Sequence, residues 1–236
     1  MLRRSIRIAA LAAVVVPVAA FTFGGWVVIT VDSLPEYAVA GTPTTLTFAV
    51  RQHGMTMLSD LRPYVVARNG STVVEAISGT TPNGRYSTTM TLPREGAWTI
   101  DIRSGFMNGT RSTPLMPLRV VATGASSPPP MPDALRGKHL FVAKGCITCH
   151  VHPETSEWET TNAGPNLTGR RYVAEVLAAF LDDPEKSTLS QSPRSGIGSA
   201  TYVRMPKLGL DRREITALVA FVNGGNAVAN RAGSDR

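Results

Sequence analysis

The residues of this chain that could do chemistry are concentrated in one short segment. Both cysteines lie there, as Cys146 and Cys149, and His150 follows the second one directly. Two thiols and an imidazole at this spacing can hold a metal, form a disulfide, or attach a haem covalently. The order of these three residues and the pattern of the rest of the chain distinguish among these three chemistries.

The order C-x-x-C-H favours covalent haem. The two thiols add to the vinyl groups on one edge of the porphyrin, and the adjacent imidazole then lies where it can bind the iron. A zinc site typically uses two separated ligand pairs, but no second cysteine pair exists. A thioredoxin-like redox pair belongs in an α/β pattern, which is absent, and a structural disulfide gives the histidine no role. We therefore predict one haem c, attached through Cys146 and Cys149, with His150 as a metal ligand.

A second iron ligand is expected from a residue far along the chain. Met205 lies in YVRMPKLGL, and Pro206 stiffens the loop that would present its sulfur. His152 is too close to the attachment segment to cross the ring, and His139 is expected to be a surface or packing residue. We predict that Met205 is the second metal ligand.

The elements that must position these residues fall into two domains joined by a linker. Residues 123–132, TGASSPPPMP, form a semi-rigid solvated linker, because consecutive prolines join neither a helix nor a central strand. Residues 25–122 alternate apolar and polar side chains between turn signals such as Asn69-Gly70 and Asn108-Gly109. They predict about seven strands in an all-β immunoglobulin-like sandwich.

Residues 133–230 show a helical period and predict an all-α domain. The expected helices run from Asp133 to Lys144, from Arg170 to Asp183, and from Asp211 to Gly224-Gly225. The second carries an apolar stripe of Tyr172, Val173, Val176, Leu177 and Phe180, and the third begins with a capping-box-like pair of Asp211 and Glu214. Three helices with long loops bury little surface, so a cofactor is expected to fill the centre.

From about Pro132 to Val228 the chain resembles a class I cytochrome c. The matching segments are GKHLFVAKGCITCH, GPNLTG, YVRMPKLGL and DRREITALVAFVNG. The resemblance implies a cytochrome c fold in which the region of Gly137–Phe141 packs on the region of Leu218–Val222.

The same resemblance implies two further cofactor-binding residues. The carbonyl oxygen of Pro165 would accept a hydrogen bond from His150, which fixes the imidazole tautomer, and Leu167 would pack on the haem face. Whether Trp158, Tyr172 or Tyr202 bonds a haem propionate is left open.

The N-terminal half is similar, more loosely, to the YtkA-like β-sandwich domains of exported proteins, in LPEYAVAGTPTTLTFAVRQHG and LPREGAWTIDI. This resemblance implies a fold and an export route but no firm activity, and a binding or docking module fits it best. If the strand continued, His53, Met55 and Met57 would share a face and could bind Cu(I). The alternative is a hairpin turn at His53-Gly54 followed by two packing methionines.

The first residues indicate export. A basic start and an apolar run predict a signal peptide over residues 1–20, with a membrane anchor over residues 8–31 as the alternative. Either places the protein in the periplasm or another extracytoplasmic space, soluble or attached to a membrane by its N-terminus. The formal net charge is +7, but no Lys/Arg run is interleaved with aromatic residues, so nucleic acid is not an expected partner.

Iron with two axial protein ligands carries one electron and has no open position for a substrate. We therefore expect an electron carrier of a respiratory or photosynthetic chain and not an enzyme, with redox proteins, including membrane complexes, as partners. Two alternatives remain: a haem subunit of a larger oxidoreductase, and a copper-handling assembly factor. Stable co-purification with a catalytic chain would favour the first, and stoichiometric copper the second.

Overall fold

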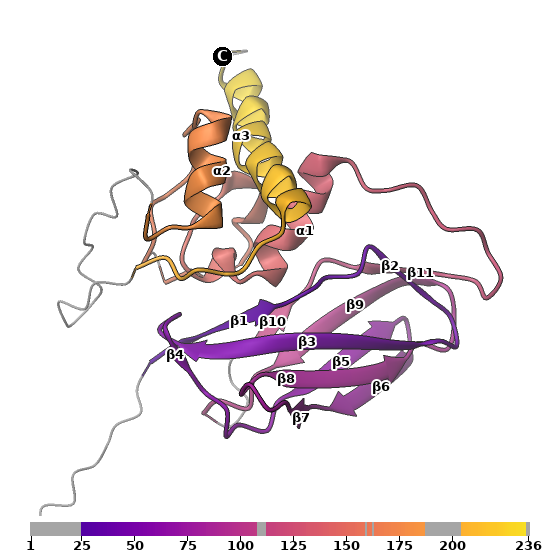
Figure 1. Cartoon of the computed structure of the whole chain (residues 1–236). Coiled ribbons are helices and arrows are strands. Elements are labelled where there is room, and N and C mark those ends of the chain that lie inside the picture. Colours follow the sequence, from indigo (N-terminus) through magenta and orange to yellow (C-terminus); the bar gives the residue numbers. More distant parts are fainter. Residues whose placement is uncertain (1–24, 108–111, 159, 162, 187–203, 235–236) are drawn as a thin grey trace, which may run out of the picture.

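The computed structural model describes residues 25–107, 112–158, 160–161, 163–186 and 204–234, with side chains up to Gly224. Within these ranges the chain forms a β-sandwich followed by a helical domain, and Figure 1 shows the helices lying over one side of the sandwich. The predicted order of an all-β and an all-α domain is confirmed.

Two sheets form the sandwich. The first has the order β1 (Val27–Val31), β3 (Pro43–Gln52), β8 (Tyr86–Thr91) and β7 (Gly79–Thr80), with β4 (Thr56–Met57) paired to β3. The second has the order β2 (Tyr37–Val39), β11 (Leu118–Val121), β9 (Gly96–Arg103), β5 (Tyr64–Asn69) and β6 (Thr72–Ile77), with β10 (Ser112–Pro114) paired to β9. Several of these strands have only two or three residues, too few to show a period in the sequence, which is why about seven were expected.

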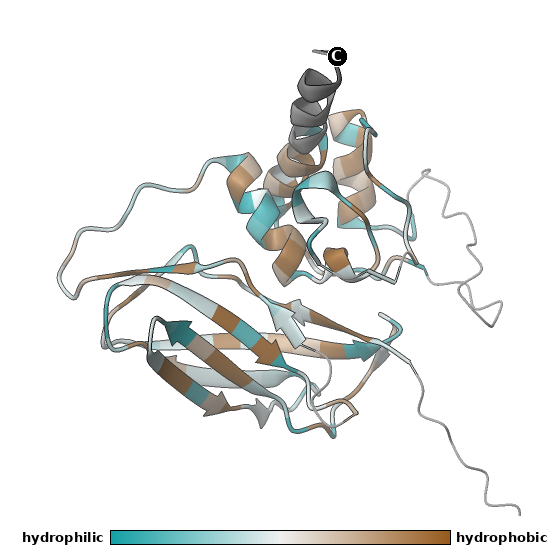
Figure 2. Cartoon of the chain, turned by 180° about the vertical axis from the view of Figure 1, so that it is seen from behind, coloured by the Kyte–Doolittle hydropathy of each residue, from teal (hydrophilic) through white to brown (hydrophobic). Residues whose placement is uncertain are grey.

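Alternation along the strands builds the core of the sandwich, and Figure 2 shows it as bands of hydropathy. In β3, Leu46, Phe48 and Val50 are at most 1% exposed and point toward the opposite sheet. Trp98 of β9 is fully buried, and its indole nitrogen donates to the carbonyl oxygen of Arg94. The expected turn at Asn69-Gly70 joins β5 to β6, whereas Asn108-Gly109 lies outside the described residues.

The helical domain is built on the crossing of its first and last helices, α1 (Asp133–Ala143) and α3 (Arg212–Ser234). A Cβ atom at Gly137 would lie 2.0 Å from the carbonyl oxygen of Ala217, so only glycine permits this approach. The rings of Phe141 and Phe221 pack beside it with centroids 5.4 Å apart. This is the crossing that the cytochrome resemblance implies.

Two helix boundaries differ from the predicted ones. α2 (Ala174–Asp182) begins after Arg170, and Val173 is extended and 66% exposed, so the predicted stripe is buried only at Leu177 among its five members. α3 continues past Gly224, whose φ is not positive. A glycine costs a helix interior only about 1 kcal/mol, so it ends a helix only where the backbone turns left-handed.

The apolar N-terminal run is divided between described and undescribed residues. Val27–Val31 form strand β1, so these five residues belong to the sandwich and not to the end of a membrane anchor over residues 8–31. Residues 1–24, which include the predicted signal peptide, lie outside the described part. Among the described residues, no helix has the length and apolarity that crossing a membrane requires.

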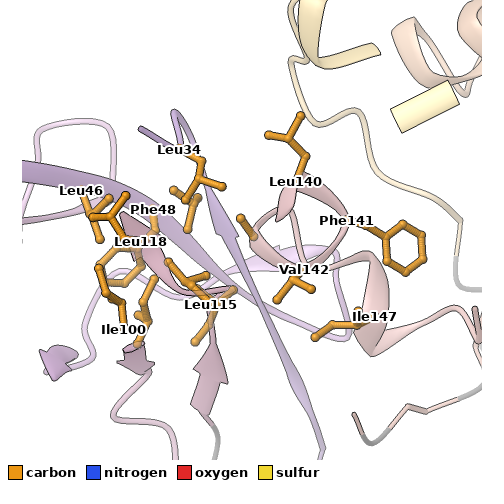
Figure 3. Packing of buried hydrophobic residues seen from close by; sticks show 14 of the residues in the cluster. Leu34, Leu46, Phe48, Ile100, Leu115, Leu118, Leu140, Phe141, Val142 and Ile147 are labelled. Carbon is orange, nitrogen blue, oxygen red and sulfur yellow. The ribbon is translucent and has the colours of Figure 1, made fainter. Parts of the chain in front are cut away.

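The two domains are in contact along one side. Their buried apolar side chains form a single cluster, and Figure 3 shows members from both, including Leu34 and Leu115 of the sandwich and Leu140, Val142 and Ile147 of the helical domain. The linker is also held to the sandwich, because Ser127 hydrogen bonds to Tyr37 and the Met131 amide donates to Glu36. Most of the linker residues are nonetheless exposed, so the segment is solvated and is tethered to the sandwich at these two points.

Candidate functional site

One large cavity lies in the helical domain at the predicted attachment segment. It holds about 430 Å³ and is lined mainly by apolar side chains, including Phe141, Leu177, Phe180, Leu181, Leu218 and Val222. Six predicted site residues also line it: Cys146, Cys149, His150, Pro165, Leu167 and Met205. An apolar cavity with a few convergent thiol, imidazole and thioether groups suits a flat, largely apolar cofactor that carries a metal.

A short 3₁₀ turn, η1 (Cys146–Thr148), presents the two thiols. Gly145 precedes it with φ 80°, a left-handed conformation that lets the chain leave α1 sharply. Both cysteines are free, and burial raises the pKa of Cys146 to about 12 and that of Cys149 to about 11. Each is therefore a neutral thiol, which is the form that adds its sulfur and hydrogen across a vinyl group.

The imidazole of His150 is held in one orientation. Its Nδ1 lies 3.0 Å from the carbonyl oxygen of Pro165, the contact that the cytochrome resemblance implies. Because a carbonyl only accepts, Nδ1 must carry the proton, and burial lowers the pKa of the ring, so Nε2 keeps a lone pair. A Cβ atom at Gly164 would lie 2.4 Å from His150 Cε1, so glycine at this position makes room for the ring.

Met205 lines the same cavity from the segment that precedes α3. Its side chain is partly buried against the apolar cluster, and Pro206 and Leu208 line the cavity beside it. Leu167 lines the cavity and is 7% exposed. The fold therefore brings sulfur from a distant segment to the cavity that also receives His150.

A clamp on the backbone of Tyr172 was not foreseen from the sequence. The Asn223 side chain accepts from the Tyr172 amide at 3.0 Å and donates to the Tyr172 carbonyl at 3.1 Å, which joins α3 to the segment before α2. The side chain of Tyr172 lines the cavity, whereas Trp158 packs in the apolar cluster and is not among the lining residues. Tyr202 lies outside the described residues.

The other histidines of this domain do not line the cavity. His152 is fully buried against Phe141 and Phe221, and burial lowers its pKa to about 4. His139 faces the seam between the domains, beside Leu34 and Glu36. Among the described residues, no group of three or more His, Cys, Asp and Glu side chains is arranged to hold a metal ion by itself.

The segment with a possible copper ligand set forms the hairpin turn that was the alternative. The Met55 amide donates to the carbonyl oxygen of Gln52, and the central residues His53 and Gly54 have φ values of 52° and 74°. The His53 ring packs edge-on against Trp26, and Met55 is 49% exposed. These residues therefore do not continue one strand face, and copper binding stays a prediction that metal analysis can check.

Two further features of the site could not be read from the sequence. The Nζ atom of Lys144 lies 2.7 Å from Oε1 of Glu214 and 2.7 Å from the carbonyl oxygen of Asp32, so a buried ammonium joins α1, α3 and the sandwich. The sandwich also lines the cavity, through Val28, Thr30 and Gly54. Both features join segments that are far apart along the chain.

Comparison with known proteins finds one family model and several solved structures. Residues 134–225 match the family model described as Cytochrome c. Among solved structures, the filamin domain of Lin-41 is 19% identical, with a TM-score of 0.33 over 40% of this chain and 91% of that one. Domains 4 and 5 of the S-layer protein SbsC are 23% identical, with a TM-score of 0.29 over 42% of this chain and 54% of theirs. No curated protein matches the chain.

Proposed function

Since residues 134–225 are a cytochrome c domain, which binds haem and carries electrons, we propose that this protein holds one covalent haem c and transfers single electrons between exported redox proteins. The observation that carries the proposal is the convergence of Cys146, Cys149, His150 and Met205 on one apolar cavity. These groups come from two segments separated by all of α2, and they are the sulfur and nitrogen ligands that a c-type haem uses.

Different residues of the chain would hold different parts of the haem. Cys146 and Cys149 would supply the thiols for the thioether bonds, and His150 and Met205 would be the residues that bind the iron. Pro165 fixes the orientation of the His150 imidazole, because its carbonyl oxygen accepts a hydrogen bond from Nδ1 and leaves Nε2 as the nitrogen that would bind iron. Leu167 lines the cavity and excludes water from it.

Bound haem supplies an iron that cycles between the ferric and ferrous states. The soft thioether of Met205 would favour ferrous iron, and the apolar lining would disfavour the extra charge of ferric iron, so the reduction potential is expected to be positive. If His150 and Met205 both bind the iron, no coordination position would be left for a substrate. The protein therefore acts as a carrier, and its donor and acceptor are other redox proteins, including membrane complexes.

Export follows from the chemistry of the attachment. Thioether formation needs reduced thiols presented outside the cytoplasmic membrane, and the basic and apolar start over residues 1–20 is typical of a secretory signal. We place the mature protein in the periplasm or an equivalent space. N-terminal sequencing of the purified protein tests this, with Phe21 as the first residue after cleavage.

Retention of the haem under denaturing conditions tests the central proposal. The chain, expressed where c-type haem is attached, should keep its haem stain in a denaturing gel. Cys146→Ala and Cys149→Ala should each weaken or abolish the stain, whereas Ser127→Ala in the linker should not. Complete extraction of haem from the wild-type protein by acidified acetone would contradict covalent attachment.

A further inference from the structure

Strand β1 is buried on both faces, although it is an edge strand of its sheet. Val27, Ile29 and Val31 point into the sandwich core. Val28 and Thr30 point the other way, yet they are only 6% and 2% exposed. The outer face of an antiparallel sheet is normally solvated, so something outside the sandwich covers this one.

The helical domain covers it, at the residue that precedes the first haem-attaching cysteine. A Cβ atom at Gly145 would lie 2.4 Å from Val28 Cγ1 and 2.6 Å from the carbonyl oxygen of Ile29. Thr30 Oγ1 donates to the carbonyl oxygen of Lys144 at 3.4 Å. In Figure 1, β1 accordingly lies on the side of the sandwich that faces the helices.

The same face of the sandwich reaches the cofactor cavity. Val28 and Thr30 of β1 and Gly54 of the β3–β4 turn line it together with Cys146 and Cys149. A Cβ atom built on Gly54 would lie 3.6 Å from a methyl carbon of Val28. The strand and the turn therefore form one continuous surface. We call this surface the β1 wall: Val28, Thr30 and Gly54.

Polar contacts keep the wall in register with the helical domain. The buried ammonium of Lys144 donates to the carbonyl oxygen of Asp32, one residue beyond β1, and pairs with Glu214 of α3. Arg136 of α1 donates to the carbonyl oxygen of Leu34. Both contacts lie just beyond the C-terminal end of β1, at Asp32 and Leu34, and add to the contact of Val28 and Ile29 with Gly145 in holding the domains together.

We propose that the sandwich is a built-in part of the haem site, in which the β1 wall closes the cavity beside the thioether-forming cysteines and shields the haem from water. The proposal rests on the proposed function, and it assigns the sandwich a role at the cofactor that goes beyond that of a docking module. A wetter surrounding stabilises the more highly charged ferric state, so an opened wall lowers the reduction potential. It also gives small molecules access to the haem edge.

Two neighbouring valines provide a matched test. Val27 and Val28 are equally buried, but Val27 faces the sandwich core and Val28 faces the cavity. In the full-length haem protein, Val28→Ala should lower the reduction potential and raise the rate of reduction by ascorbate several-fold. Val27→Ala should lower the melting temperature but leave potential and rate at wild-type values. Equal changes of reduction potential and reduction rate in both variants would contradict the proposed role of the β1 wall.

Two further arms keep the test decisive. Val28→Thr preserves the shape of the side chain and adds a hydroxyl toward the cavity, so it should shift the potential in the same direction if Val28→Ala is poorly folded. Hydrogen exchange at the backbone amides of residues 144–146 measures how well β1 covers this segment and does not depend on a haem signal. Val28→Ala should raise the exchange rate of these amides, and Val27→Ala should not. Wild-type protein without covalent haem would contradict the proposed function, whereas unchanged exchange in Val28→Ala would contradict the wall.

Discussion

The ammonium of Lys144 and the carboxylate of Glu214 form an ion pair of 2.7 Å whose side chains are only 1% and 10% exposed. The other carboxylate oxygen of Glu214 accepts from the Asp211 amide at 3.2 Å, while the Glu214 amide donates to Asp211 at 2.8 Å. The predicted capping box of α3 is therefore present, and its glutamate also neutralises a cation buried where the two domains meet. One side chain thus links the start of the last helix to the domain interface.

Removing the charge of Glu214 should destabilise the protein. Glu214→Gln keeps a residue that can complete the capping box but leaves Lys144 buried without a counter-charge. Breaking a buried pair in this way costs about 3 kcal/mol, which denaturant unfolding of the full-length protein can measure. In the control, the double variant with Lys144→Met should recover much of the loss, because no unpaired charge remains. Wild-type stability in Glu214→Gln alone would show that the pair contributes little.

The same substitution at two helical glycines should have opposite effects. Gly137→Ala places a methyl group 2.0 Å from the carbonyl oxygen of Ala217, so α1 and α3 must separate, at a cost of about 1–3 kcal/mol. Gly224→Ala meets no atom within 4 Å and should stabilise α3 by up to about 1 kcal/mol. Thermal unfolding of both variants checks the signs. Wild-type stability of the Gly137→Ala protein would show that α1 and α3 are farther apart at their crossing than in this structure.

Met205 should be the second iron ligand. Met205→Ala should abolish the near-infrared band that arises from charge transfer between sulfur and ferric iron, open the iron to carbon monoxide, and lower the reduction potential, because the ligand that favours ferrous iron is lost. Met205→His should restore two axial ligands at a lower potential than the wild type. Met116, a partly buried methionine that does not line this cavity, provides the control, and Met116→Ala should keep the band. An unchanged band in Met205→Ala would place the ligand elsewhere.

Acid should destabilise the protein partly through His152. Burial lowers its pKa from 6.5 to about 4, so between these values the unfolded chain binds a proton that the folded protein does not. Its contribution to stability is thus present above pH 6.5 and is lost as the pH falls from about 6.5 to about 4. His152→Asn keeps an acceptor for the Glu154 amide but cannot titrate. As the pH falls from about 6.5 to about 4, the free energy of unfolding should decrease less steeply for the variant than for the wild type. Parallel curves for the two proteins would show that His152 does not cause the loss of stability in acid.

Local pattern was sufficient for much of the fold and the site. Alternation in β3 and the turn at Asn69-Gly70 predict the sandwich, because strands and tight turns are set by neighbours along the chain. The spacing of Cys146, Cys149 and His150 predicts the attachment segment for the same reason. Where local signals compete with packing they fail: Tyr172 reads as part of α2, but its backbone groups are held by Asn223, and Gly224 reads as a helix end although no left-handed turn follows.

The sequence by itself determined the two domain classes, the C-x-x-C-H segment and the capping box of α3, since each depends on residues within a few positions of one another. Only the tertiary structure decided that Val28 faces a cavity formed largely by the other domain, that α3 packs closely against Gly137, and that Lys144 forms an ion pair with Glu214. The physical reason is that period two assigns the side chains of β1 to two faces but says nothing of what covers either one. Burial of the outer face depends on a surface more than a hundred residues away, and that surface exists only once both domains have folded and met.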